Sequence, residues 1–142
     1  MRFRIAAAVL LVGDLLVGLW ATIAPRSFYD EFPGVGQHWV AADGPFNEHL
    51  IRDVGALNLA LAVVAIGAML RPRRFSRLAG ATHLVWTGVH LGYHATHLDM
   101  LSTGAGAASV AALTVPVLAA LFLVFFSPPD DVPLIDIGPS TA

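Results

Sequence analysis

The chain has 142 residues, of which 56% are hydrophobic and only 13% charged, and its formal net charge at pH 7 is −2. Charged residues make up about a quarter of an ordinary soluble domain, so this deficit predicts that much of the surface faces lipid. The slightly acidic balance gives no electrostatic reason to bind nucleic acid. The sequence contains no cysteine, which excludes disulfides, thiol chemistry and thiolate-bound metals.

Four apolar stretches are each long enough to cross a bilayer as a helix, which takes about 20 residues. The first is longer than the apolar core of a secretory signal and lacks a good cleavage pattern, so we interpret it as a retained helix. We expect helices at about 5–24, 45–70, 75–98 and 105–126. Together they predict an all-α fold, a four-transmembrane-helix bundle that forms a single integral membrane domain over residues 1–142.

The expected helix ends follow from proline and from capping residues. Pro25 is expected to stop the first helix and to begin a long loop. Asp43 or Gly44 is expected to cap the second helix, with Pro45 at its first position. The tail at 130–142 is acidic and rich in proline, and we expect little regular structure there.

Basic residues predict the orientation of the bundle. Six of the eight lie before the first helix or around the connection between the second and third helices: Arg2, Arg4, Arg71, Arg73, Arg74 and Arg77. The positive-inside rule therefore places both termini in the cytoplasm and the bundle in the plasma membrane. The connection at 25–44 then faces outward, and its aromatic residues could form either an interfacial belt or a lid over the helix ends.

Four histidines of the third predicted helix share one face. His83, His90, His94 and His97 point in directions that fall within roughly 60° of one another at about 100° per residue. His90 and His94 are four residues apart, so one helix can present two imidazoles to a single ion, as metallohydrolase helices do. The signal is less specific than a full metalloprotease motif because no glutamate directly follows His90.

The second predicted helix carries polar residues at the matching depth. Its outer end contains Glu48, His49, Arg52 and Asp53. His49 and Asp53 are again four residues apart and share a face. Because brief connections usually join antiparallel neighbours, we expect these side chains to lie level with the histidines of the third helix.

These residues predict a transition-metal site at the outer membrane face. Imidazole and carboxylate ligands suit zinc, iron, copper or nickel rather than calcium or magnesium. Glu48 and Arg52 are the candidate catalytic residues, as a proton acceptor and as the binder of an anionic head group. The candidate metal ligands are His49, Asp53, His90, His94 and His97.

Haem is an alternative cofactor for which the sequence offers few axial ligands. His83 and His97 are 14 residues apart, the spacing seen in four-helix membrane cytochromes. Such bis-histidine ligation needs histidines on a second helix, and only His49 is available there. At most one haem could therefore be ligated on both sides.

Two ionisable residues are expected deeper in the bundle. Asp14 lies near the middle of the first helix, where a buried carboxyl group needs a partner. Asn58, His90 or a backbone group could supply that partner. His83 lies apart from the outer cluster, and we interpret it as a structural residue.

Three segments resemble a family of small actinobacterial membrane proteins. They are PRSFYDEFPG from Pro25, GPFNEHLIRDVG from Gly44 and HATHLD from His94. The resemblance covers most of the chain and implies a four-helix topology and an actinobacterial origin. It implies no function, because the family has no assigned activity.

Three functions remain open on the sequence alone. The first is a membrane metalloenzyme, an oxidoreductase or hydrolase, whose metal activates water or oxygen toward a lipid or another apolar substrate. The second is a non-catalytic subunit of a homo-oligomer or of a larger membrane complex. The third is transport of a metal ion or of protons, with Asp14 and His83 continuing the path inward.

Overall fold

The computed structural model describes residues 1–128, and over this range the chain forms five α-helices and one short 3-10 helix. The all-α class is confirmed for the described residues, whereas the expectation for the tail at 130–142 lies outside them. The elements are α1 (Arg2–Ile23), α2 (Pro25–Glu31), α3 (Glu48–Leu70), α4 (Pro72–Thr96), η1 (Leu98–Met100) and α5 (Thr103–Phe126).

Three helices, α1, α3 and α5, are long and apolar enough to cross a membrane. The fourth long helix, α4, has 25 residues, but arginines near its start and histidines farther along make it more polar. Large hydrophobic side chains remain exposed on all four long helices, for example Val12, Val63, Val89 and Leu118. Such a surface suits lipid, and the helices indicate a membrane-associated protein.

The first helix ends at Ile23, close to the expected residue 24, but the loop expected to begin at Pro25 and the cap expected for the second helix are both wrong. Pro25 does not begin a loop, because it is the first residue of α2. This position suits proline, since its fixed φ is helical and a backbone N–H at this position would have no partner within the helix. Helix α3 begins three residues later than expected, at Glu48. The side chain of Asn47 caps it by accepting a 3.1 Å hydrogen bond from the backbone N–H of Leu50. Asp43 therefore belongs to the connecting loop.

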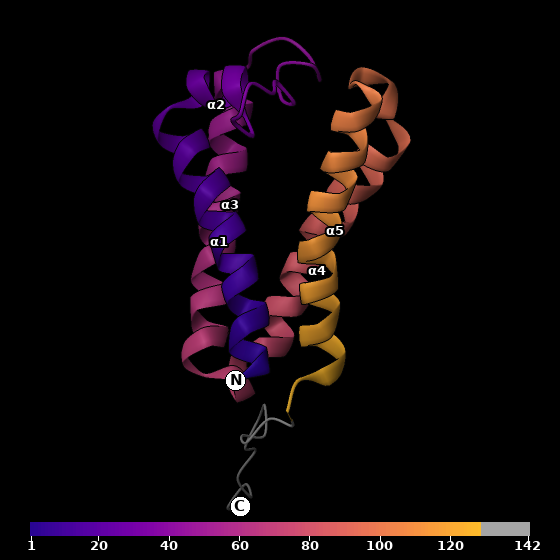
Figure 1. The fold of residues 1–142 in the computed structure, drawn as a ribbon. Helices are drawn as coiled ribbons and strands as arrows, with labels where there is room; N and C mark the ends of the chain where they lie inside the picture. Colours follow the sequence, from indigo (N-terminus) through magenta and orange to yellow (C-terminus); the bar gives the residue numbers. More distant parts are fainter. Residues whose placement is uncertain (129–142) are drawn as a thin grey trace, which may run out of the picture.

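The four long helices form two pairs, α1 with α3 and α4 with α5 (Figure 1). Glycine allows close approach within each pair. A Cβ atom on Gly18 of α1 would lie 2.9 Å from the side chain of Leu59 in α3. A Cβ atom on Gly80 of α4 would lie 2.7 Å from the carbonyl oxygen of Ala120 in α5. Small residues commonly permit such close helix crossings in membrane proteins.

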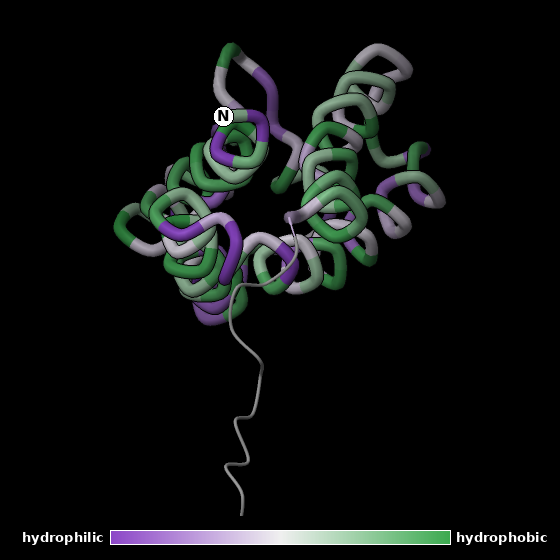
Figure 2. The backbone as a smooth tube through the Cα atoms, turned by 90° about the horizontal axis from the view of Figure 1, so that it is seen from below, coloured by the Kyte–Doolittle hydropathy of each residue, from purple (hydrophilic) through white to green (hydrophobic). Residues whose placement is uncertain are grey.

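The two pairs pack together at one end of the bundle and diverge toward the other (Figure 1). We call the end with α2 and residues 32–47 the loop end, and the end with Met1 the N-terminal end. The view from the N-terminal end shows mainly hydrophobic residues along the long helices (Figure 2). The core at this end takes buried residues from all four of them: Ala7, Leu10, Ala65, Ala68, Ala79 and Leu123.

A second apolar core lies at the loop end and belongs to the α1–α3 side alone. Its buried residues are Ala21, Phe28 and Ile51. Aromatic side chains such as Trp20 and Phe46 pack against them. Within residues 1–128, no residue of α4 or α5 takes part in this core. The buried residues of α4 all lie from Ser76 to Thr87, so the part of the helix after Thr87 has none.

Candidate functional site

The polar residues at the start of α3 are exposed and pair with one another. Nε2 of His49 lies 3.4 Å from Oδ2 of Asp53, and the two side chains are 87% and 62% exposed. Nε of Arg52 donates a 2.8 Å hydrogen bond to Glu48. Arg52 also donates to the backbone carbonyl of Thr22 in α1. Of the two predicted catalytic residues, Arg52 thus links α3 to the end of α1, and Glu48 accepts a hydrogen bond from it.

The histidines at the loop end of α4 form two groups. The rings of His90 and His94 lie edge to face with 4.8 Å between their centroids, and both are partly buried. His90 also stacks on Trp86, with centroids 5.2 Å apart. His97 is exposed and stacks instead on Tyr93, at 4.2 Å. His90 and His94 are therefore adjacent, as their spacing predicts, whereas His97 contacts its own helix.

The predicted ligands do not come together as one group. Across residues 1–128, no three histidine, aspartate or glutamate side chains are close enough to hold a metal ion. The physical reason lies in how α3 packs. Its buried face, which includes Ile51 and Gly55, lies against α1 and α2, so that His49 and Asp53 are left on the exposed surface.

The loop before α3 brings a different carboxylate to α4. The hydroxyl of Tyr93 donates a 2.8 Å hydrogen bond to Oδ1 of Asp43. On the other side, the hydroxyl of Tyr29 in α2 donates a 2.7 Å bond to the carbonyl of Gly44. The loop therefore bridges the two helix pairs at the loop end. Asp43 is also close enough for its charge to act on His90.

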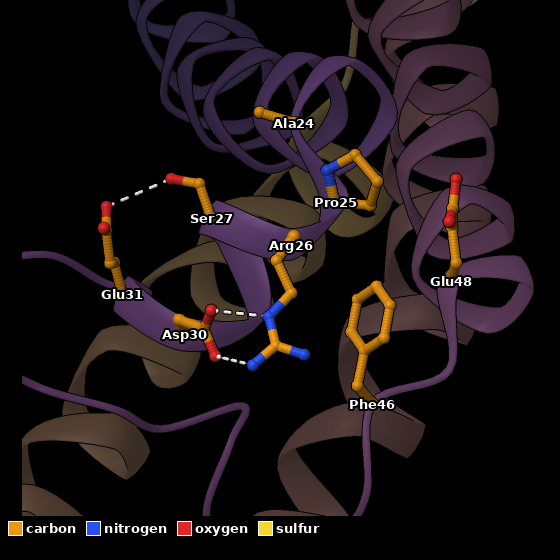
Figure 3. Close-up of a pocket in the computed structure, with 8 residues that line it drawn as sticks. All are labelled: Ala24, Pro25, Arg26, Ser27, Asp30, Glu31, Phe46 and Glu48. Atoms are coloured by element: carbon orange, nitrogen blue, oxygen red, sulfur yellow. Dashed lines mark hydrogen bonds and ion pairs between the residues drawn. The ribbon is translucent and has the colours of Figure 1, made fainter.

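An open surface pocket of about 700 Å³ lies beside α2, and its polar side chains are already paired (Figure 3). Arg26 donates hydrogen bonds of 2.7 and 3.0 Å to Asp30, and this bonding raises the pKa of Arg26 above its ordinary value. Ser27 donates a 3.0 Å bond to Glu31. No histidine lines this pocket, which is formed by Ala24, Pro25, Arg26, Ser27, Asp30, Glu31, Phe46 and Glu48.

A buried polar contact joins α1 to α4. Oδ2 of Asp14 lies 2.8 Å from Nε2 of His83, and the side chains are only 7% and 1% exposed. Nδ1 of His83 lies 2.7 Å from the carbonyl oxygen of Ala79. The partner of Asp14 is therefore His83 and not Asn58, whose amide donates to the carbonyl of Val54.

Hydrogen-bond chemistry fixes the number of protons on this pair. A carbonyl oxygen can only accept, so Nδ1 of His83 must carry a proton and donate it to Ala79. The 2.8 Å contact between Nε2 and Asp14 needs one further proton, carried by either the imidazole or the carboxyl group. Both arrangements leave the pair neutral overall, which costs least in an apolar environment.

Comparison with known protein families, with curated proteins and with solved structures finds no match for this chain. The resemblance of the three sequence segments to small actinobacterial membrane proteins stays a prediction.

Proposed function

We propose that the protein is an integral membrane protein that binds a transition-metal ion through His90 and His94. The observation that carries this proposal is the adjacent pair of imidazoles, with 4.8 Å between ring centroids, on the part of α4 that contains no fully buried residue. Histidines one helical turn apart can bind a single ion once their rings rotate toward it. Imidazole ligands favour zinc, iron or copper.

In this proposal α4 is the fourth membrane-spanning helix. Its buried His83 contacts Asp14 of α1, so the cost of placing this histidine at membrane depth is reduced by a partner within the protein. Arginines cluster at the N-terminal end, which the positive-inside rule places in the cytoplasm of the plasma membrane. The loop end and the metal then face outward.

We infer that Asp43 completes the ligand set when the side chains move together on metal binding, since no three such groups within residues 1–128 lie close enough in this structure. Tyr93 holds Asp43 by a 2.8 Å hydrogen bond to Oδ1, and its charge acts on His90. Three protein ligands leave a coordination position open, which suits a metal that activates water or oxygen. A lipid or another apolar substrate would reach it from the bilayer where the helix pairs diverge. His49, Asp53 and His97 lie outside this set.

Elemental analysis of protein purified without chelators tests the proposal. We expect about one zinc, iron or copper ion per chain in the wild type, as a mononuclear site requires. His90→Ala and His94→Ala should both lose it. His49→Ala is the matched control, because His49 likewise has a possible metal ligand four residues away, Asp53, but lies on the exposed face of α3.

The pattern of loss distinguishes the alternatives. Loss of the ion in His49→Ala as well would assign the ligands to α3 and α4 together and exclude the set proposed here. If the wild type stays free of metal after growth with added zinc, iron and copper, the metal-binding proposal is wrong.

A second candidate function is that of a non-catalytic subunit, and the stack of His90 on Trp86 favours it. The two rings have an interplanar angle of 16° and centroids 5.2 Å apart, which is the geometry of a packed aromatic pair. In that case the imidazoles serve packing in a homo-oligomer or a larger membrane complex. His90→Phe would then preserve the assembly, as measured by native size after gentle extraction.

A further inference from the structure

A row of polar residues on α4 leads from the buried Asp14–His83 pair to the loop end. His83, Thr87, His90 and His94 follow one another at intervals of four, three and four residues, which keeps them on one helix face. Their exposure rises along the row. His83 is 0% exposed and Thr87 7%, while His90 and His94 are partly exposed.

Toward the N-terminal end, the same face of α4 is fully buried. It continues to Ala79 and Ser76, which are both 0% exposed. Ala79 belongs to the apolar core of the N-terminal end, together with Leu10 and Leu123. The hydroxyl of Ser76 is buried without a hydrogen-bond partner. No polar chain therefore leads from His83 toward the N-terminal end through these residues.

The other helices bring no further ionisable side chain to the pair. Helix α5 contains none along its whole length. Helix α3 contains none from residue 54 to residue 70, where the buried polar residue is the neutral Asn58. The ionisable residues of α3 all lie in its first two turns at the loop end.

The two helices that carry the pair, α1 and α4, also have few ionisable residues near it. On α1, no ionisable residue lies between Arg4 and Asp14, and none follows Asp14. On α4 the nearest are Arg77 and His90, six and seven residues from His83. These intervals correspond to about 9 and 10 Å along the helix axis. The charge of the pair is therefore governed mainly by its own protons.

We propose that Asp14 and His83 form a proton-binding site that exchanges protons with the loop end only. In the neutral state one proton lies between Nε2 and Oδ2. Uptake of a second proton gives an imidazolium beside a carboxylic acid, with a net charge of +1. Loss of the first gives a neutral imidazole facing a carboxylate, with a net charge of −1. Each charged state is costly in an apolar core and is stabilised by water, which reaches the pair along the polar row of α4.

The site is distinct from the proposed metal centre, since it needs neither His90 nor His94 as a ligand. It would make the packing of α1 against α4 depend on the proton concentration at one face of the membrane. A protein with such a site can respond to pH on that side without passing protons across.

Cysteine labelling tests the one-sided access, because the chain has no cysteine of its own. Thr87→Cys places a thiol on the loop-end side of the pair, and Ser76→Cys places one on the other side. Both substitutions change the volume little, and each variant is reconstituted as the full chain in sealed vesicles of known orientation. A water-soluble, membrane-impermeant thiol reagent is then added to either side at mildly alkaline pH.

We expect Thr87→Cys to be labelled from the side of the loop end and Ser76→Cys to be labelled from neither side. Labelling of Ser76→Cys from the N-terminal end, or complete protection of Thr87→Cys, overturns the one-sided access. Unfolded protein would label at both positions, so an unreactive Ser76→Cys also shows that the bundle is intact.

Infrared difference spectroscopy tests the proton itself, because a carboxyl group absorbs differently with and without its proton. We expect a pH-dependent carboxyl band in the wild type and in the control variant Asp53→Asn. The band should be absent in Asp14→Asn, and its frequency should be shifted in His83→Gln. A spectrum without any band from Asp14, over the pH range in which the fold persists, overturns the proposal. The band should persist in wild-type protein stripped of metal by a chelator, so the proton site and the metal site can fail independently.

Discussion

Oδ2 of Asp14 and Nε2 of His83 lie 2.8 Å apart although 69 residues separate them in the sequence, and their hydrogen bond joins the two helix pairs. The bond is buried, and the carbonyl of Ala79 occupies the other nitrogen of the ring. Within residues 1–128, neither side chain has a further hydrogen-bond partner beyond these contacts. Removal of one therefore leaves a polar atom of the other buried and unpaired, which is the more costly way to break a hydrogen bond.

The first prediction is that Asp14→Ala destabilises the protein more than Asp14→Asn. Alanine leaves Nε2 of His83 without a partner, and we expect a loss of about 1–3 kcal/mol in the free energy of unfolding. The amide of asparagine can donate to Nε2 of a neutral imidazole, so its loss should be smaller. Unfolding by denaturant in detergent micelles measures the difference.

Asp53→Ala is the control for this series, because its side chain is 62% exposed. We expect a change within about 0.5 kcal/mol, as for most surface substitutions. Equal losses in Asp14→Ala and Asp14→Asn would contradict the proposed hydrogen bond and would mean that the negative charge of Asp14 is what stabilises the fold.

The long helices could be predicted from the sequence because their signal is local. Apolar length defines them, and the expected ends lie within three residues of those observed for α1, α3, α4 and α5. Helix α2 was missed because its seven residues are too few to show a periodic pattern. In addition, Pro25 is compatible both with the end of one helix and with the first position of the next.

The second prediction is that Gly80→Ala weakens the contact between α4 and α5, whereas Gly88→Ala does not. A Cβ atom on Gly80 would lie 2.7 Å from the carbonyl oxygen of Ala120 and 2.8 Å from the backbone nitrogen of Val124. Backbone atoms cannot rotate away, so the helices must separate, and we expect a cost of about 1–3 kcal/mol. The measurement is again unfolding in micelles.

Gly88 lies on the same helix with no atom within 4 Å of its added Cβ, which makes it the matched control. Alanine there should leave stability unchanged or raise it by up to about 1 kcal/mol through its higher helix propensity. If both variants lose stability equally, the effect comes from glycine in α4 generally and not from the close approach of α5.

The pairing of side chains between helices could not be predicted in the same way. A period of about 100° per residue correctly places His90 beside His94, but it does not say which helix a face meets. Because α3 buries its face against α1 and α2, His49 and Asp53 turn to the surface. Asp43 reaches α4 through a contact across 50 residues of sequence, for which no local pattern exists.

The third prediction is that acid releases the proposed metal ion. Imidazole binds a metal only in its neutral form, so protons compete with the ion at His90 and His94. Once both rings are protonated, affinity should fall by up to about 100-fold for each further unit of pH, since two protons are displaced on binding. Metal content after equilibration across a pH series and removal of free ions measures this dependence.

His49→Ala should follow the wild-type curve in the same experiment, because His49 lies outside the proposed ligand set. Asp43→Asn should hold the ion less tightly at neutral pH while keeping the steep loss in acid. If the metal content did not change with pH, ligation by two imidazoles would be contradicted.

The fourth prediction concerns the loop that bridges the two helix pairs. Tyr93→Phe removes the bond to Asp43, and Tyr29→Phe removes the bond to Gly44. Each phenylalanine can keep the ring contacts of the tyrosine it replaces, including the 4.2 Å stack of Tyr93 on His97, so the change isolates the hydroxyl group. We expect faster amide hydrogen exchange over residues 38–46 in both variants, measured by mass spectrometry.

The two variants should differ in metal binding, and this difference separates the role of α4 from that of α2. Tyr93→Phe frees the proposed ligand Asp43 and should lower metal affinity, whereas Tyr29→Phe leaves Asp43 bonded to α4 and should lower it less. Unchanged exchange in Tyr93→Phe would mean that this bond does not hold the loop. Equal affinities in both variants and the wild type would remove Asp43 from the ligand set and leave His90 and His94 as its only members from this chain.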